Sequence, residues 1–145
     1  MKNTICLYPD HVIVWVPKLG GDLLPCRIDE SDLDLVSSFP NTWRAQWDPH
    51  SKTFYVVGLQ RRKSTLLHRL IMEAPRGMEV DHRDHDGLNN RRKNLRIVTR
   101  SQNALNRKGA RAGSRSGVRG VYWHKLMQQW RASVRLPDGK RHEIG

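Results

Sequence analysis

Four polar side chains in the middle of the sequence are of types that together could hydrolyse a phosphodiester bond. Asp81 and His82 are adjacent at the end of a short apolar run, and Asn94 and Asn103 follow along the chain. A neutral imidazole can accept a proton from water near pH 7. Carboxylate and amide oxygens are hard ligands that suit Mg²⁺ or Mn²⁺ rather than zinc. Any one of these residues alone is better explained as a surface histidine or a turn residue.

The segments around these residues alternate between strand, loop and strand. Residues 78–81 and 95–98 are predicted to be strands, because both carry apolar and β-branched side chains. Residues 83–93 between them are predicted to be a loop, because they are rich in Asp, Asn and Gly. Asp84, His85 and Asp86 in this loop are alternative ligands of lower rank, because turn formation already explains them.

A short helix is predicted to follow the second strand. Thr99 and Gln102 have the spacing of a capping box, in which each side chain bonds the backbone N–H of the other residue. Asn103 then lies in the first turn, where the positive end of the helix favours a nearby anionic phosphate. Asn106, three residues further on the same face, is the second choice as a ligand.

This pattern resembles the HNH nuclease motif with its ββα-metal site, in particular the branch found in phage and intron-encoded homing endonucleases. In that branch the third signature residue is often Asn, as Asn103 is here. The resemblance implies that His82 is the general base, and that Asp81 and Asn103 bind one Mg²⁺ or Mn²⁺ ion per active site. It also implies that Asn94 holds the loop and orients the His82 ring. The implied reaction cuts DNA as a nick or a double-strand break and leaves a 5′-phosphate and a 3′-hydroxyl.

A helical segment is predicted just before the motif. Over residues 64–74 apolar side chains recur at helical spacing, and a proline and a glycine follow. His68 and Arg69 match a His-Arg pair of the resembled family, and we expect His68 to be a buried, hydrogen-bonded histidine that supports the motif. The basic run at residues 61–63 is either a solvated charge run or a phosphate contact.

The first 60 residues are predicted to hold a strand, a helix and a hairpin. Residues 11–16 are rich in β-branched side chains, which favours a strand, and residues 29–38 have the pattern of a short helix. Residues 42–47 and 53–59 are predicted to pair as the hairpin. Three aromatic side chains of this hairpin could stack on nucleobases or fill a small core, and the core is favoured. They are Trp43, Trp47 and Tyr55.

The two cysteines and the apolar runs exclude several classes of protein. Cys6 and Cys26 form no CxxC pair, so a zinc knuckle is not expected. A disulfide between them stays open, although a reduced cytoplasmic compartment fits better. No apolar run approaches the ~18 residues that a membrane span needs, and the N-terminus lacks the pattern of a signal peptide. We therefore expect no membrane partner and no small-molecule cofactor.

Positive charge is concentrated on and around the motif. The chain has a formal net charge of +12, and residues 61–119 hold 16 of its 26 basic side chains but only 5 of its 14 acidic ones. Residues 1–60 hold 5 basic and 7 acidic side chains. Such a distribution favours a polyanionic partner, for which nucleic acid is the usual identity.

The C-terminal segment differs in composition from the motif. Residues 109–116 are rich in Gly, Ser and Arg, which is typical of a linker or a basic arm. Three strands are predicted after it, over residues 118–124, 130–136 and 141–144, with a turn at Pro137-Asp138-Gly139. This segment resembles the sheet of an AP2 DNA-binding domain, but it ends where that family continues into a helix. A three-stranded sheet with one bare apolar face is marginal alone.

Taken together, the sequence predicts an α+β fold with four parts. These are a helix and hairpin region (1–60), an HNH core (61–108), a linker (109–116) and a partial AP2-like sheet (117–145). The predicted function is metal-dependent cleavage of double-stranded DNA in the cytoplasm of a bacterial or phage-infected cell. The alternative is a DNA-binding protein with a decayed nuclease site. Candidate DNA contacts are Arg61, Arg62, Lys63, Arg91, Arg92, Arg119, Trp123, Arg131 and Arg135.

Overall fold

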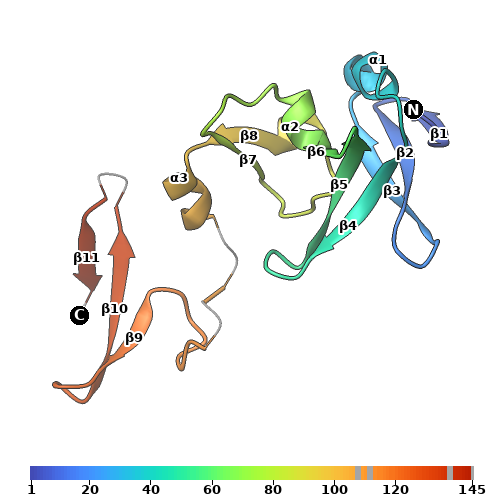
Figure 1. The fold of residues 1–145 in the computed structure, drawn as a ribbon. Helices are drawn as coiled ribbons and strands as arrows, with labels where there is room; N and C mark the ends of the chain where they lie inside the picture. The colour runs from blue at the N-terminus through green and yellow to red at the C-terminus, as the bar shows by residue number, and fades with distance from the viewer. Residues whose placement is uncertain (107–108, 111–112, 137–138, 145) are drawn as a thin grey trace. The chain divides into compact units, whose positions relative to one another are not determined.

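The computed structural model describes residues 1–106, 109–110, 113–136 and 139–144 of the chain (Figure 1). The chain divides into two compact units, Met1–Asn103 and Ala104–Gly145. The architecture mixes a few short helices with several small antiparallel sheets, which agrees with the predicted α+β class. Within the described residues, every helix is too short or too polar to span a membrane. The predicted four-part division stays a prediction.

The first unit begins with a three-stranded antiparallel sheet. It is formed by β1 (Ile5–Tyr8), β2 (His11–Pro17) and β3 (Leu23–Ile28), with β2 in the centre. Alternate valines of β2 are buried, which confirms the strand predicted at residues 11–16. Cys6 and Cys26 are free thiols in the two outer strands.

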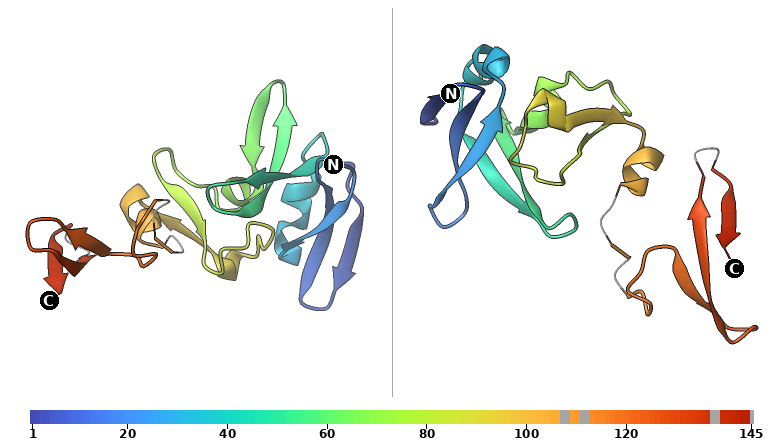
Figure 2. Two further views of the ribbon diagram at one scale, coloured as in Figure 1. Left: turned by 90° about the horizontal axis from the view of Figure 1, so that it is seen from below. Right: turned by 180° about the vertical axis from the view of Figure 1, so that it is seen from behind.

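A second sheet packs against the first. The 3-10 helix Glu30–Asp32 and α1 (Leu33–Ser37) confirm the predicted short helix and lead into the sheet. The sheet consists of β4 (Trp43–Asp48), β5 (Thr53–Gln60) and β6 (Lys63–Leu66). Strands β2 and β4 are in contact, and the two sheets lie side by side in every view (Figure 2).

The aromatic residues of the hairpin have three different surroundings. Trp43 is fully buried, and its indole N–H donates to the Val36 carbonyl at 3.1 Å. Trp47 is half exposed. Tyr55 packs against two histidine rings. The core role is therefore confirmed for Trp43 alone.

The helix predicted over residues 64–74 is wrong at its start. Residues 63–66 form β6, which pairs with β5, and only Leu67–Ile71 form the helix α2. Arg61 and Arg62 both have positive φ, 47° and 65°, and turn the chain back onto β5. The edge of β5 forms hydrogen bonds with the backbone N–H and C=O groups of residues 63–66. The helical spacing of the side chains does not reveal this pairing.

The segment that holds the chemical motif folds in the predicted order. Strands β7 (Glu79–His82) and β8 (Leu95–Val98) pair antiparallel, with His82 opposite Leu95. The helix α3 (Arg100–Leu105) follows. The Thr99 N–H donates to Gln102 Oε1 at 2.9 Å, and the Gln102 N–H donates to Thr99 Oγ1 at 3.2 Å. The capping box is therefore confirmed.

The second unit contains the three predicted C-terminal strands. They are β9 (Val121–His124), β10 (Gln129–Arg135) and β11 (Arg141–Ile144), with β10 in the centre. Strand β9 begins three residues later than predicted. Of the predicted turn, Pro137 and Asp138 lie outside the described residues, as do residues 111 and 112 of the predicted linker.

Candidate active site

His82 lies at the end of β7, and one buried amide holds its ring. Only 4% of His82 is exposed, and Asn90, which is fully buried, places Oδ1 at 3.4 Å from His82 Nε2. Asn90 Nδ2 donates to the Cys26 sulfur at 3.3 Å and to the Gly87 carbonyl at 3.2 Å. Since both amide hydrogens have acceptors, Oδ1 must face the imidazole. His82 then carries its proton on Nε2, and Nδ1 keeps a lone pair that can accept a proton.

Two aromatic neighbours enclose the His82 ring. His68, on α2, packs edge-to-face on it with ring centroids 5.0 Å apart, and Tyr55 lies at 5.7 Å. His68 is buried as expected, but its Nδ1 has no hydrogen-bond partner, so the expectation of a hydrogen-bonded histidine is wrong at that nitrogen. The rings of both Tyr55 and His82 pack edge-to-face against the His68 ring. The result is an apolar wall beside the candidate base.

This burial keeps both imidazoles neutral. Loss of solvent lowers the pKa of His82 below its usual 6.5, although the hydrogen bond with Asn90 and the charge of Asp84 act in the opposite direction. Burial lowers the pKa of His68 further, to about 3, and the nearby His82 and Arg69 add to the effect. His82 is therefore in its base form at neutral pH.

Asn94 organises the loop between β7 and β8. Its Nδ2 donates to Asp84 Oδ1 at 2.9 Å and to the Asn89 carbonyl at 2.8 Å, and its Oδ1 accepts the Asp84 N–H at 3.2 Å. Asp84, an alternative ligand, is thus engaged within the loop. Burial raises the pKa of Asp84, but hydrogen bonds from Asp86 N–H, Asn89 and Asn94 lower it overall. Among the described residues, the hydrogen bond to the His82 ring comes from Asn90 rather than Asn94.

The expected metal ligands lie next to a second carboxylate. Asp81 Oδ2 accepts hydrogen bonds from Arg96 Nε at 2.8 Å and Nη2 at 2.6 Å. Asn103 Nδ2 donates to Glu79 Oε2 at 2.5 Å, which holds the start of α3 against β7. Glu79 and Asp81 are two residues apart on one strand and therefore point to the same face.

This donor set fits a hard divalent cation. Asp81, Glu79 and Asn103 offer carboxylate and amide oxygens on one face of the β7–β8 pair, and Asn103 already has its nitrogen turned toward Glu79. No group of three or more His, Cys, Asp or Glu side chains gathers around a point in the described part of the chain. An ion here would therefore need oxygens from the phosphate and from water.

The loop is fastened to both sheets of the first unit. The Gly87 N–H donates to Thr53 Oγ1 at 3.1 Å, and a Cβ on Gly87 would collide with the Phe54 carbonyl. On the other side, the Arg27 N–H donates to the Leu88 carbonyl at 2.8 Å. The Asn90 N–H donates to the Arg27 carbonyl, also at 2.8 Å. These contacts hold Asn90 in place beneath His82.

Arg91 and Arg92, expected to contact DNA, bind carboxylates of the chain itself. Arg91 bonds Asp29 and Asp10, each at 2.8 Å, and Arg92 bonds the buried carboxylate of Asp32 at 2.7 Å. These ion pairs raise the pKa of each guanidinium. Both side chains fasten the loop to the N-terminal region, and their contact with DNA stays a prediction.

The other predicted DNA contacts are distributed over both units. Arg61, Arg62 and Lys63 are exposed at the β5–β6 turn of the first unit. In the second unit, the Arg119 guanidinium donates to the Ala104 carbonyl at 2.7 Å, and Arg131 bonds Glu143 at 2.8 Å.

Strand register separates the predicted contacts of the C-terminal sheet. Trp123 pairs with Trp130, whereas Arg131 pairs with Tyr122, so Trp123 and Arg131 point to opposite faces. Arg135 lies on the Arg131 face, four residues along the strand. Trp123 and the two arginines cannot all contact one groove through a single face.

Sequence reasoning missed Asn90, Cys26 and Glu79. The Asn89-Asn90 pair is typical of a turn, and this local pattern does not predict the contact of Asn90 with His82. Cys26 lies far from the motif in sequence, and no local pattern points to its contact with Asn90. Glu79 gave a usable signal, because it precedes Asp81 by two residues and a strand places such residues on one face.

Comparison with known proteins agrees with this geometry. Residues 65–105 match the HNH endonuclease family. The chain is 35% identical over 70 residues to "Protein 3.8" of Escherichia phage T7, covering 48% of this chain and 56% of that protein. It is 36% identical over 98 residues to "Uncharacterized HNH endonuclease L560" of Acanthamoeba polyphaga mimivirus, covering 64% of this chain and 49% of that protein.

The extent of these matches defines what they establish. The chain spans about half the length of the curated relatives it matches. No solved structure matches the chain significantly. The family match covers α2, β7, β8 and α3, together with the loop between β7 and β8. Residues 65–105 of this chain are therefore similar to an HNH endonuclease domain, and the chain is related to a viral protein that is named as an HNH endonuclease.

Proposed function

We propose that this chain is a metal-dependent endonuclease that hydrolyses phosphodiester bonds of double-stranded DNA. The observation that carries the proposal is the state of His82, a buried neutral imidazole fixed by Asn90 with Asp81 beside it. A neutral base held in one orientation is what activation of water requires.

The proposed reaction is a single displacement at phosphorus. His82 Nδ1 accepts a proton from water as the water oxygen bonds to the phosphorus atom, and the bond to the 3′ oxygen breaks. The leaving 3′ oxygen takes a proton from solvent, so the products are a 5′-phosphate and a 3′-hydroxyl. Asp81 and Asn103, with Glu79 adjacent, would hold one Mg²⁺ or Mn²⁺ ion, whose chemistry is to neutralise charge on the scissile phosphate and leaving oxygen.

The remaining residues of the site have positioning roles in this proposal. Asn90 sets the tautomer of His82, and Asn94 holds the loop in shape. Arg96 bonds Asp81 and holds that carboxylate in one orientation. His68 and Tyr55 exclude water from one side of the base.

The C-terminal sheet is proposed to bind DNA through its polar face. Register places Arg131, Arg135 and Arg141 on that face, where Arg141 also lies over the Tyr122 ring at 4.6 Å. The opposite face carries Trp123, Trp130, Val134 and Ile144. A basic face of this kind suits phosphate contacts, and together with the nuclease core it suits a homing-type enzyme that cuts at a defined site.

Nicking of supercoiled plasmid tests the proposed function. The chain should nick the plasmid with Mg²⁺ or Mn²⁺ and not in EDTA. His82→Ala should slow nicking by about 10²–10⁴-fold and leave DNA affinity nearly unchanged, because a general base contributes to the chemical step alone. His50→Ala, on an exposed turn, is the matched control and should nick at the parent rate. Metal-independent nicking, or equal loss of binding and nicking in His82→Ala, would contradict the mechanism.

A further inference from the structure

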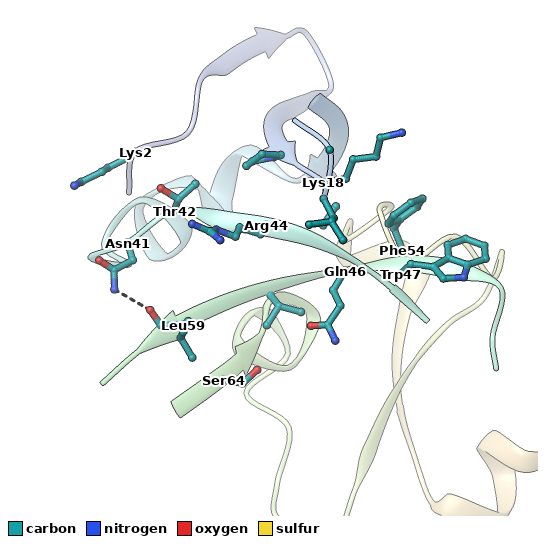
Figure 3. A pocket seen from close by; sticks show the side chains of 15 residues that line it. Lys2, Lys18, Asn41, Thr42, Arg44, Gln46, Trp47, Phe54, Leu59 and Ser64 are labelled. Atoms are coloured by element: carbon teal, nitrogen blue, oxygen red, sulfur yellow. Dashed lines mark hydrogen bonds between the residues drawn. The ribbon is translucent and has the colours of Figure 1, made fainter. Parts of the chain in front are cut away.

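A broad groove lies on the first unit, away from the His82 ring. It has a volume of about 1210 Å³ and is bounded by the turn between β2 and β3, by the edge strand β4, and by parts of β5 and β6. In the view of Figure 3, Lys2 and Arg44 lie toward the left of the groove, and Lys18, Phe54 and Trp47 lie toward the right. None of the side chains assigned to the proposed reaction lines it.

Charge in the N-terminal region is segregated toward this groove. Residues 1–60 carry more acidic than basic side chains, yet the groove is lined by three of the five basic ones and by none of the seven acidic ones. The three are Lys2, Lys18 and Arg44. Three of the acidic side chains bond Arg91 and Arg92 instead. The groove is therefore a locally basic surface in a net acidic segment, and its charge is complementary to a polyanion.

Two of the three cations are available for an anion. Lys2 and Arg44 are exposed, and neither has an ion-pair partner among the described residues. Lys18 bonds Asp22 at 2.9 Å, an exposed pair that contributes little and exchanges readily with a phosphate. The exposed amide of Gln46 adds a donor and an acceptor to the same wall.

An aromatic surface completes the groove. Half of Trp47 is exposed, and its ring rests on the edge of Phe54 with centroids 5.0 Å apart, which fixes its orientation. Leu59, 60% exposed, adds apolar surface to another part of the groove, beside Asn41. A rigid, half-exposed indole among cations is the arrangement that stacks an unpaired nucleobase while the cations contact its phosphates.

The groove and the candidate active site share one sheet. In the β4–β5 register, Gln46 is opposite Tyr55 and Arg44 is opposite Val57, so all four side chains point to the same face. Tyr55 contacts the His82 ring. By the same register, Trp47 and Phe54 point to the opposite face, so the groove passes around the edge strand β4. A polynucleotide in it would contact Arg44 and Gln46 on the Tyr55 face and Trp47 beyond the edge.

We propose that this groove binds a single-stranded segment of nucleic acid, with phosphates on Lys2, Lys18 and Arg44 and one base stacked on Trp47. Stacking requires a base whose flat face is open, which paired bases inside a duplex do not offer. The proposal rests on the proposed nuclease function for the source of that strand, a locally unpaired part of the substrate. Binding itself is independent of cleavage.

Fluorescence anisotropy with a fluorescein-labelled oligothymidylate tests the groove directly, using the full chain with His82→Ala to prevent cleavage. Arg44→Glu should weaken binding about tenfold or more. The negative slope of log affinity against log salt should become shallower by about 0.7, because one phosphate contact is lost. Trp47→Ala should weaken binding by about five- to a hundredfold, with little change in slope. Trp47→Phe, which keeps an aromatic ring on Phe54, should recover part of the loss. Circular dichroism checks that each variant is folded.

The matched control is Lys52→Glu, the same charge reversal on an exposed turn outside the groove. It should leave affinity and salt slope near the parent values. Equal losses in Lys52→Glu and Arg44→Glu, no binding of oligothymidylate by the parent, or tighter groove-dependent binding of a blunt duplex would each overturn the proposal. Groove-dependent binding by a chain that never nicks plasmid would support the groove and refute the nuclease function. Normal nicking by a chain whose oligothymidylate binding does not depend on the groove would support the nuclease function and refute the groove.

Discussion

The side-chain oxygen of Asn90 lies 3.4 Å from Nε2 of His82, and both residues are almost completely buried. The Asn90 amide is itself held by the Cys26 sulfur, in a strand 64 residues away in sequence. A core cysteine of the first sheet is thereby connected to the candidate general base through one amide. The N-terminal sheet consequently helps to hold the candidate base, a role that its sequence does not suggest.

Substitution of Asn90 should change the pH dependence of cleavage. Because burial lowers the pKa of His82, the acid limb of kcat/KM should lie below pH 6.5 in the parent. Asn90→Asp keeps the shape but places a carboxylate against Nε2. It favours the imidazolium and should therefore move the acid limb to higher pH. Plasmid nicking rates measured across pH report this shift.

Substitutions of Cys26 test whether its contact with Asn90 helps to hold His82. Cys26→Ser keeps an acceptor for the Asn90 amide and should retain most of the activity, whereas Cys26→Ala should lower kcat more than it changes KM. An Asn90→Asp profile that matches the parent would mean that the amide does not set the state of His82.

Metal binding should depend on the nucleic acid. Only a few protein oxygens are present, so Mn²⁺ affinity should be weak for the chain alone and rise when DNA is bound. Asn103→Ala should lower nicking by about a hundredfold or more, while Asn106→Ala should have a small effect. Isothermal titration with Mn²⁺, with and without uncleaved DNA on the His82→Ala background, measures the first effect. Tight metal binding without DNA would show that other ligands complete the site.

Arg92 should matter more for stability than for DNA affinity. Arg92→Ala leaves the buried carboxylate of Asp32 without its partner and should cost about 1–3 kcal/mol of unfolding free energy in urea titrations. Lys93→Ala removes the adjacent exposed charge and should change stability by less than about 0.5 kcal/mol. If the two variants are equally stable and Arg92→Ala alone weakens DNA binding, the ion pair is secondary to phosphate contact.

His68 should make the protein less stable in mild acid. Its pKa is about 3 in the folded chain and near 6.5 when unfolded, so between these values only the unfolded state takes up the proton. Its contribution to stability is therefore complete above pH 6.5 and is lost as the pH falls toward 3, at up to about 1.4 kcal/mol per pH unit. His68→Gln should flatten this dependence in urea unfolding between pH 6.5 and 5. An unchanged slope would show that His68 becomes protonated without unfolding.

Removal of residues 114–145, the larger part of the second unit, should weaken DNA binding more than cleavage chemistry. If Arg119, Arg131 and Arg135 contact phosphates, each contributes about −0.9 to the slope of log affinity against log salt. A chain ending after Gly113 should bind the same duplex more weakly with a shallower slope, and keep metal-dependent nicking at low salt. If single arginines contact guanine edges instead, each loss should cost ~1–3 kcal/mol at one base position. Unchanged affinity and slope would show that this unit does not bind DNA.

The order of elements around the site could be predicted because local chemistry determines it. The Thr99 and Gln102 side chains meet across a single helical turn, so their spacing alone placed the start of α3 correctly. The β-branched pattern of residues 95–98 likewise gave β8 with its correct bounds. In each case the interacting groups lie within a few residues of one another, and the sequence displays them together.

Contacts between distant segments were decided by the tertiary structure alone. Residues 63–66 became a strand because the edge of β5 was there to bond them, in spite of helical spacing. Arg91 and Arg92 meet carboxylates about 60 residues away, and Asn90 meets both Cys26 and His82. The motif itself determined which groups could do chemistry. Which amide holds the base, and which arginines are occupied by ion pairs, depended on packing between segments that no local pattern relates.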